Sequence, residues 1–473
     1  MRIQEEPFLP EFILYKKYIY NTMCGVRMNK KIKIAEKLFL ACDFDEAFLR
    51  CKELAEEGNA RAMYLLGILY GFGYGHVERN RDACLHWLER STAEGEYLAW
   101  VAMASIIPPE TTGVSTVFNG LAEMLIPLAQ AGDIFAQYEV GMLYINGWGI
   151  EPDIEKGAEW IKKSADTGYF IAMDDLATLY KERALGSGRE KDAWRYYLKA
   201  AGLGYRDAEY HLGECYYEGC GIERDLEKAV ICYKKALSNG SMQAADALGT
   251  MCILGEGNVG DKHKAFSYFK KASQGGYIRS LGKLGDCYYY GRGIAQDFVK
   301  ARTCYEEAWE HGDYFVAVRI GTIYLVGLGV AKDEKTALAW FTKSAEAGDP
   351  DGVYFLAECY WFGIGTLENK EKAITMYVNA AEVGQVSAMT RLGEMAQASK
   401  RYEEAVHWFE SAASLGYPPA ENLLAICYYK GNGVPKNEKI AREWLNRAEV
   451  QGDKEATRLK QQLWGITSKS NIQ

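Results

Sequence analysis

Residues 213–236 read "GECYYEGCGIERDLEKAVICYKKA", and residues 285–308 read "GDCYYYGRGIAQDFVKARTCYEEA". The second stretch begins 72 residues after the first and keeps its Cys-Tyr-Tyr, Gly-x-Gly, Asp and Lys-Ala in register. Such an internal echo is typical of a fold built by stacking copies of one unit. These two stretches therefore predict a repeat protein and not a set of unrelated globular domains.

The length of the unit follows from a glycine that recurs at steps of 37, 37 and then 36 residues, with a single step of 32. One complete unit lies between the two quoted stretches, so their 72-residue spacing is two repeats. Repeat positions are counted here from the residue after each of these glycines. The series is Gly58, Gly95, Gly132, Gly168, Gly204, Gly240, Gly276, Gly312, Gly348, Gly384, Gly416 and Gly452.

Each unit carries the pattern of a helical hairpin. Position nine is Gly in seven repeats, and because a helical Gly costs about 1 kcal/mol relative to Ala, we expect a second helix to pack closely there. Glycines at positions fifteen and seventeen, in eight repeats, end the first helix with positive φ angles. Asp or Asn near position twenty-one is typical of the N-cap of a second helix.

Composition excludes several classes of protein. The chain has 473 residues, 48% of them hydrophobic, which is enough for a continuous core. Its net charge of −9 argues against nucleic acid as the main partner. No run of eighteen uncharged apolar residues occurs, so we expect no membrane span, and the first twenty residues do not form a signal peptide.

The pattern Ala-x-x-x-Leu-Gly-x-x-Tyr-x-x-Gly-x-Gly, best kept in 205–240, resembles the Sel-one-like repeat, a longer-looped relative of the tetratricopeptide repeat. The resemblance covers about residues 59–452. It implies an all-α fold, an α-solenoid that winds as a right-handed superhelix of about eleven repeats with end caps. It also implies a non-catalytic scaffold or adaptor for protein or peptide partners, with the first helix of each hairpin lining the concave groove.

Outside the repeats, the sequence predicts three further segments. These are an extension over 1–27 that is poorly anchored, an opening hairpin over 28–58 with Met28 as an alternative start, and a capping helix and tail over 453–473. The repeat 96–132 is degenerate, with Pro108 and Pro109 in place of loop glycines. The predicted repeats are 59–95, 96–132, 133–168, 169–204, 205–240, 241–276, 277–312, 313–348, 349–384, 385–416 (with a short loop) and 417–452.

No motif supports catalysis, a metal or a cofactor. The six histidines are scattered over five repeats without metal-ligand spacing. Ser-x-x-Lys occurs at 267–270 and 280–283, but no Lys-Thr-Gly follows, so a β-lactamase-like enzyme is only an alternative.

The cysteines bear on location. Cysteines at position eleven (215, 287, 359 and 427) predict reduced core thiols and a bacterial cytoplasmic protein, with Cys220 exposed in its Gly-Cys-Gly loop. A secreted or host-delivered effector is the open alternative.

A two-repeat rhythm marks the candidate groove. Position ten is acidic and position thirteen is aromatic in the alternate repeats 205–240, 277–312 and 349–384. One interpretation is a record of duplication, and the other is a groove for a segment bearing Lys or Arg. The candidate groove residues are Tyr210, Glu214, Tyr217, Glu218, Asp286, Tyr289, Tyr290, Glu358, Trp361 and Phe362.

Overall fold

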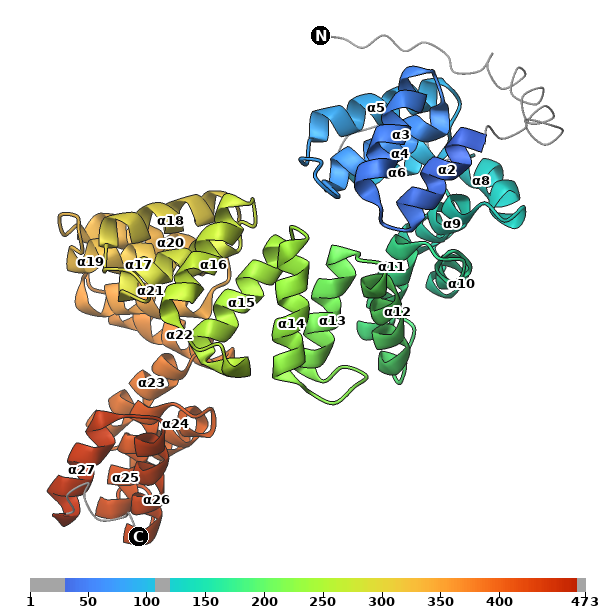
Figure 1. The fold of residues 1–473 in the computed structure, drawn as a ribbon. Helices are drawn as coiled ribbons and strands as arrows, with labels where there is room; N and C mark the ends of the chain where they lie inside the picture. The colour runs from blue at the N-terminus through green and yellow to red at the C-terminus, as the bar shows by residue number, and fades with distance from the viewer. Residues whose placement is uncertain (1–29, 107–119, 466–473) are drawn as a thin grey trace. The chain divides into compact units, whose positions relative to one another are not determined.

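The computed structural model describes residues 30–106 and 120–465, and every regular element in these ranges is a helix (Figure 1). The all-α repeat architecture is therefore confirmed. The predictions for 1–27, for Pro108 and Pro109, and for the last eight residues lie outside the described ranges. The chain divides into two compact units between Gly260 and Asp261, and the division falls inside the repeat 241–276.

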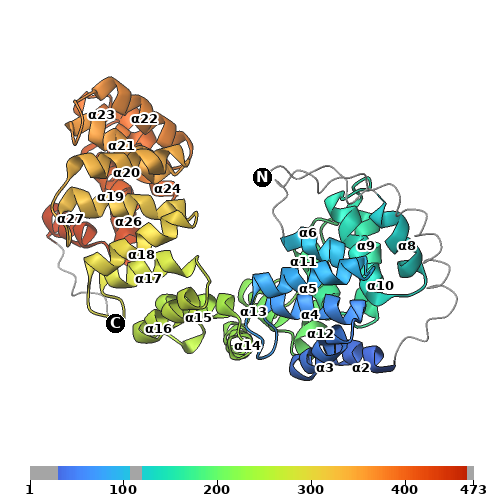
Figure 2. The same ribbon diagram turned by 90° about the horizontal axis from the view of Figure 1, so that it is seen from above.

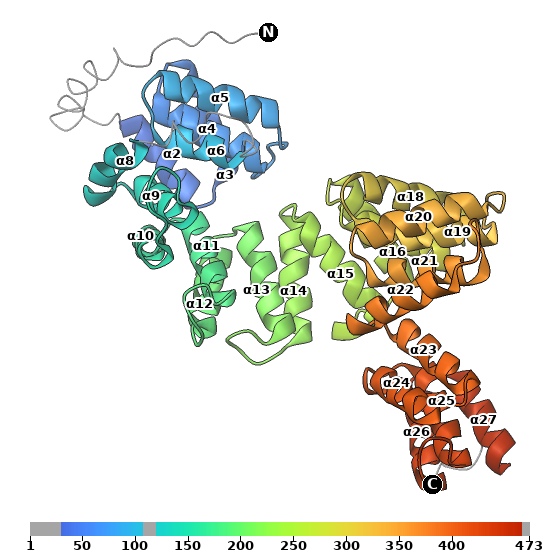
Figure 3. The same ribbon diagram turned by 180° about the vertical axis from the view of Figure 1, so that it is seen from behind.

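The described part of unit 1 opens with the hairpin of α2 (Lys30–Leu40) and α3 (Phe44–Glu56). The hairpins that follow it are seen from three directions in Figures 1, 2 and 3. Their first helices are α4 (Ala60–Phe72), α6 (Leu98–Ile106), α9 (Ile134–Asn146), α11 (Phe170–Lys181), α13 (Arg206–Glu218) and α15 (Met242–Leu254), which is followed by η1 (Glu256–Asn258). Their second helices are α5 (Arg81–Ala93), α8 (Leu121–Gln130), α10 (Ile154–Asp166), α12 (Glu190–Gly202) and α14 (Leu226–Ser238).

Unit 2 begins with a second helix, α16 (Lys262–Gln274), and ends with the capping helix α27 (Lys454–Trp464). Its first helices are α17 (Ser280–Tyr290), α19 (Ala317–Val326, preceded by η2, Tyr314–Val316), α21 (Pro350–Phe362), α23 (Val386–Ala398) and α25 (Pro418–Lys430). Its other second helices are α18 (Phe298–Glu310), α20 (Glu334–Glu346), α22 (Lys370–Glu382), α24 (Tyr402–Ser414) and α26 (Glu438–Val450). No described helix of either unit is long and apolar enough to cross a membrane.

The turn of the hairpin 205–240 uses the predicted residues. Gly219 and Gly221 have φ angles of 79° and 70°, a conformation that residues with a Cβ rarely adopt. A Cβ at Gly221 would lie 2.1 Å from the Glu190 carbonyl oxygen, so the turn also packs tightly on the preceding hairpin. Asp225 then caps the second helix by accepting the Lys228 backbone N–H at 2.9 Å.

The glycine at position nine faces the side chain at position twenty-nine of its own hairpin. A Cβ on Gly285 would lie 2.5 Å from the Tyr305 ring, and one on Gly321 would lie 2.5 Å from the Phe341 ring. Both rings are fully buried. The predicted close approach of the second helix is confirmed, and its cause is a large side chain that occupies the space of the missing Cβ.

Unit 1 departs from a simple stack, in which each repeat touches only its neighbours. The Tyr74 and Tyr205 hydroxyls lie 3.1 Å apart although 131 residues separate them in the sequence. The ring centroids of Phe39 and Phe170 are 5.4 Å apart. Around the short α6, the Tyr64 hydroxyl of α4 donates to Glu139 of α9 at 3.0 Å. In unit 1, hairpins that are not adjacent in sequence therefore share one aromatic core.

Gly285→Leu is expected to destabilise the protein by about 1–3 kcal/mol or more, because the new side chain overlaps the Tyr305 ring and a packed hairpin relaxes only partly. Chemical denaturation followed by circular dichroism measures the change. Ser267→Leu, at an exposed position of α16, is the matched control and should change stability little. An unchanged unfolding midpoint for Gly285→Leu would contradict the packing role of position nine.

Candidate binding surface on the first helices

The candidate groove residues share one face of the first helices. Positions ten and fourteen are one helical turn apart, so their side chains lie on the same side. Positions six, seven and thirteen border them. We call this the ladder face, because polar contacts across it join α11 to α13 in unit 1, and α17 to α19 and α21 to α23 in unit 2.

In unit 2, Glu358 of α21 is paired by Arg391 of α23. The Arg391 Nε and Nη2 donate to the two Glu358 carboxylate oxygens at 3.0 Å each, a bidentate geometry. The Tyr377 hydroxyl, on the second helix of the same hairpin, donates to this carboxylate at a distance of 2.5 Å. Only 17% of the Glu358 side chain is exposed. This carboxylate is neutralised within the chain.

Asp286 of α17 repeats the arrangement two repeats earlier. The Arg319 Nε of α19 lies 2.7 Å from Asp286 Oδ1, and the Tyr305 hydroxyl donates to that oxygen at 2.7 Å. Sequence reasoning missed Arg319 and Arg391, although both stand at position seven and are 72 residues apart. Their spacing equals that of the acids, and this was the signal that could have found them.

In unit 1 the four candidate residues lie on α13. The Lys181 Nζ of α11 lies 3.1 Å from both Glu214 and Glu218, and the Tyr210 hydroxyl donates to Glu214 at 2.8 Å. The Tyr217 hydroxyl donates to Glu256 of η1 at 2.8 Å. The structure thus brings these four residues together, separately from the six candidates on α17 and α21 of unit 2.

Unit 2 also carries exposed apolar side chains at position fourteen. Tyr290 is 51% exposed, Val326 is 58% exposed and Phe362 is 56% exposed, each at the last position of its first helix. The flanking Tyr289 and Trp361 are half-buried. Val326 is absent from the predicted groove because only acids and aromatics were selected there. We call Tyr290, Val326 and Phe362 the apolar column.

On the ladder face of unit 1, carboxyl groups are buried. Burial raises the pKa of Glu139 to about 8, although the Tyr64 hydroxyl donates to it. Burial and the neighbouring Asp174 raise the pKa of Asp175 to about 7, and the Tyr138 hydroxyl donates to Asp175 at 2.7 Å.

His211 also lies on the ladder face of unit 1, next to Asp174. Burial alone would lower its pKa, but the Asp174 carboxylate, 2.9 Å from Nδ1, raises it to about 9. Titration of Glu139, Asp175 and His211 therefore changes the charge inside unit 1.

The structure also places the residues that sequence analysis considered for catalysis, metal binding or thiol chemistry. Ser267 and Lys270 are exposed on α16, and no group of three or more His, Cys, Asp or Glu able to hold a metal occurs in the described ranges. The position-eleven cysteines are buried, as predicted. Cys220 is only partly exposed, which corrects the expectation of an open loop thiol, because its turn packs against α12.

The repeat pattern matches a known protein family. A model described as the Sel1 repeat matches ten segments, and its largest gap falls on the degenerate repeat. The matched segments are 60–96, 134–169, 171–205, 206–241, 243–277, 279–313, 316–349, 350–385, 386–417 and 418–453.

Individual relatives are similar to this chain over different lengths. The protective antigen c5321 of uropathogenic Escherichia coli, a structure with an SLR fold, gives a TM-score of 0.53 at 28% identity and covers 88% of this chain and 82% of that chain. DAP3-binding cell death enhancer 1 of Rattus norvegicus is 35% identical over 85 residues, 18% of this chain and 16% of its own. The ERAD-associated E3 ubiquitin-protein ligase component HRD3B of Arabidopsis thaliana is 28% identical over 110 residues, 23% of this chain and 17% of its own. The chain spans about a sixth of these two curated relatives.

Glu139→Gln is expected to flatten the pH dependence of stability. Because folding raises the pKa of Glu139 from 4.5 to about 8, its contribution is fully present below pH 4.5 and is lost as pH rises toward 8. The amide stays neutral, so the variant should gain up to a few kcal/mol over wild type at pH 8. Thermal unfolding between pH 5 and 8 measures the difference.

Glu89→Gln, at an exposed position of α5, is the control and should leave the pH profile unchanged. A Glu139→Gln profile that parallels wild type would show that this carboxyl group does not carry the proposed burial cost.

Proposed function

Because this chain belongs to the Sel1 repeat family, we propose that it is a non-catalytic adaptor that binds protein or peptide partners on the ladder face of its hairpins. The apolar column carries this proposal. Three large apolar side chains, each more than half exposed, recur at one position of consecutive first helices. Folding leaves them in water, and a partner that covers them gains the hydrophobic free energy of their burial.

The relatives support a role in protein association. One is named for binding DAP3 and another as a component of a ubiquitin-protein ligase. Both names describe attachment to other proteins. The matched segments are repeats alone, so the proposal extends to the class of partner and not to those particular proteins.

The geometry of unit 2 indicates the chemistry of the partner. Asp286 and Glu358 already have arginine partners, so their charges are not the main attraction. Packed helices lie about 10 Å apart, so Tyr290 and Phe362, two hairpins apart, are separated by about 20 Å. An extended chain covers that distance in about six residues at 3.3 Å each. We therefore propose an extended segment with apolar side chains about three residues apart.

The expected preference for Lys or Arg then depends on the carboxylates that stay open to solvent. The side chains of Glu218 in unit 1 and Glu394 in unit 2 are 50% and 43% exposed. Contacts with such exposed charges are weak and mainly affect the rate of association. Basic residues in the partner would steer the encounter, and apolar residues would hold the complex.

We also propose a reducing, cytoplasmic location for the chain. The structure shows no disulfide among the cysteines it describes, and those at position eleven are buried within the hairpins. Titration of the freshly isolated, denatured and unreduced protein should find close to twelve thiols per chain, the number of cysteines in the sequence. Recovery of only a few thiols would favour an oxidising compartment.

Replacing both Tyr290 and Phe362 with Ala is expected to weaken partner binding at least tenfold, since large aromatic side chains dominate many interfaces. The partner is first identified by affinity purification from the native source with mass spectrometry. It is then purified and titrated against wild type and variant by calorimetry.

Val299→Ala on α18 and Val383→Ala at the end of α22 are matched controls, because both side chains are exposed and apolar but lie outside the ladder face. These variants should bind as wild type does. Equal affinity of the Tyr290 and Phe362 double variant would show that the apolar column is not the binding surface.

A further inference from the structure

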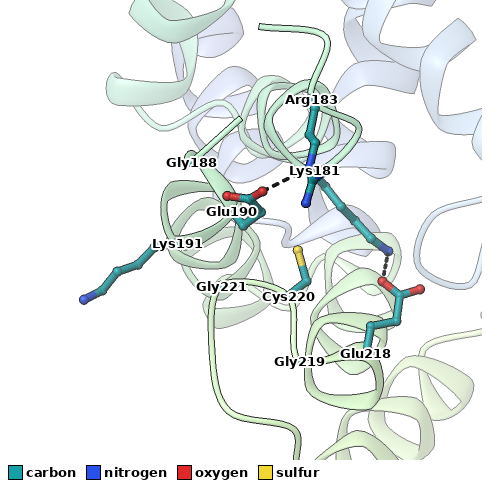
Figure 4. Close-up of a pocket in the computed structure, with 9 residues that line it drawn as sticks. All are labelled: Lys181, Arg183, Gly188, Glu190, Lys191, Glu218, Gly219, Cys220 and Gly221. Carbon is teal, nitrogen blue, oxygen red and sulfur yellow. Dashed lines mark hydrogen bonds and ion pairs between the residues drawn. The ribbon is translucent and has the colours of Figure 1, made fainter. Parts of the chain in front are cut away.

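A cavity of about 640 Å³ opens at the turn between α13 and α14, entirely within unit 1. Figure 4 shows the Cys220 side chain among charged residues from the neighbouring hairpin. The side chains that line the cavity are Lys181, Arg183, Glu190, Lys191, Glu218 and Cys220. Small solutes therefore have access to one face of the Cys220 thiol.

Cys220 lies next to a second thiol. Its backbone N–H donates to the Cys215 carbonyl at 2.9 Å, and Gly219 donates to the same oxygen at 2.9 Å. This helix-ending turn brings its first and sixth residues together. The two thiols lie near enough for each to affect the pKa of the other. A disulfide would bring the two sulfur atoms to about 2.0 Å from each other.

The pairing is particular to this repeat. Cysteine recurs at position eleven in three other repeats, and the same turn follows it, but position sixteen holds no second thiol there. The backbone bonds of those turns are Arg292 to Cys287 at 2.8 Å, Ile364 to Cys359 at 2.9 Å and Asn432 to Cys427 at 3.0 Å. The shared turn therefore serves folding, and the second cysteine at 220 is an addition to it.

We propose that Cys215 and Cys220 form a dithiol site that a small-molecule disulfide, such as oxidised glutathione, converts to an intramolecular disulfide. The Cys220 thiolate attacks one sulfur of the small molecule, forms a mixed disulfide and releases one thiol. The Cys215 thiolate then attacks the Cys220 sulfur, closes the protein disulfide and releases the second thiol. Two protein thiols are oxidised and one small disulfide is reduced.

The cavity determines which cysteine reacts first and how pH affects the rate. Cys215 is fully buried, whereas Cys220 is partly exposed. Burial raises the pKa of Cys220, Lys181 of α11 lowers it, and Glu218 of α13 and Glu190 of α12 raise it. Since the thiolate is the nucleophile, the reaction should be slow near pH 7 and faster at higher pH.

Peptide mapping tests the proposal on the full chain. Trypsin releases Asp207–Arg224, which contains Cys215 and Cys220 and no other cysteine. The native protein is treated with oxidised glutathione, denatured in acid and then alkylated. We expect this peptide to carry no alkyl group and to be two hydrogen atoms lighter than the dithiol form. In Cys220→Ser, Cys215 should be alkylated instead.

The peptide Tyr402–Lys430 is the internal control, because it carries Cys427 in the same turn without a second thiol. It should remain alkylated. Alkylation of both Cys215 and Cys220 after oxidation would overturn the proposal. So would a mixed disulfide that persists on Cys220 while Cys215 is alkylated, since Cys215 would then not complete the exchange.

Discussion

The contact between a helical glycine and the large side chain opposite it is the constraint on which the hairpins with glycine at position nine depend. At Gly285 a Cβ would lie 2.5 Å from the Tyr305 ring, so only glycine lets the second helix come this close. The buried ring fills the space and holds the two helices together. Its hydroxyl then reaches Asp286 on the ladder face. In this hairpin, the missing methyl group at Gly285 lets Tyr305 hold both the packing of the two helices and the position of Asp286.

The ladder face shows why a periodic pattern of acids need not point to a partner. A partly buried carboxylate is costly unless a cation and hydrogen bonds satisfy it. Glu358 receives both, from Arg391 and Tyr377, and Asp286 is satisfied in the same way. The two-repeat rhythm therefore has a use within the chain, a third interpretation beside duplication and partner binding. In unit 2, the apolar column is the part of this face that stays exposed to solvent.

Unit 1 depends on the repeat that keeps the pattern least. A regular array spaces its first helices evenly, and side chains reach only the adjacent hairpin. Tyr64 of α4 instead contacts Glu139 of α9, on the far side of the degenerate repeat, and Tyr74 contacts Tyr205, 131 residues away in the sequence. These contacts bury carboxyl groups whose raised pKa values make the stability of this unit sensitive to pH. The unit that contains the degenerate repeat is thus also the unit in which distant hairpins contact one another.

The sequence alone determined the hairpins, because their signals are local. A glycine that ends a helix, an Asp225 that caps the next and a Gly285 opposite Tyr305 all act within one repeat of about 36 residues. Periodicity therefore predicted the fold, and the resemblance to the Sel1 repeat implied the face that carries the candidate residues. Only the tertiary structure decided which of those residues are free, because Arg391 neutralises Glu358 from the following hairpin and Lys181 reaches Glu214 from the preceding one. It also placed the division at Gly260 inside a repeat. Such features depend on how side chains of different repeats meet in space, and the period of a sequence records only where each residue stands in its own repeat.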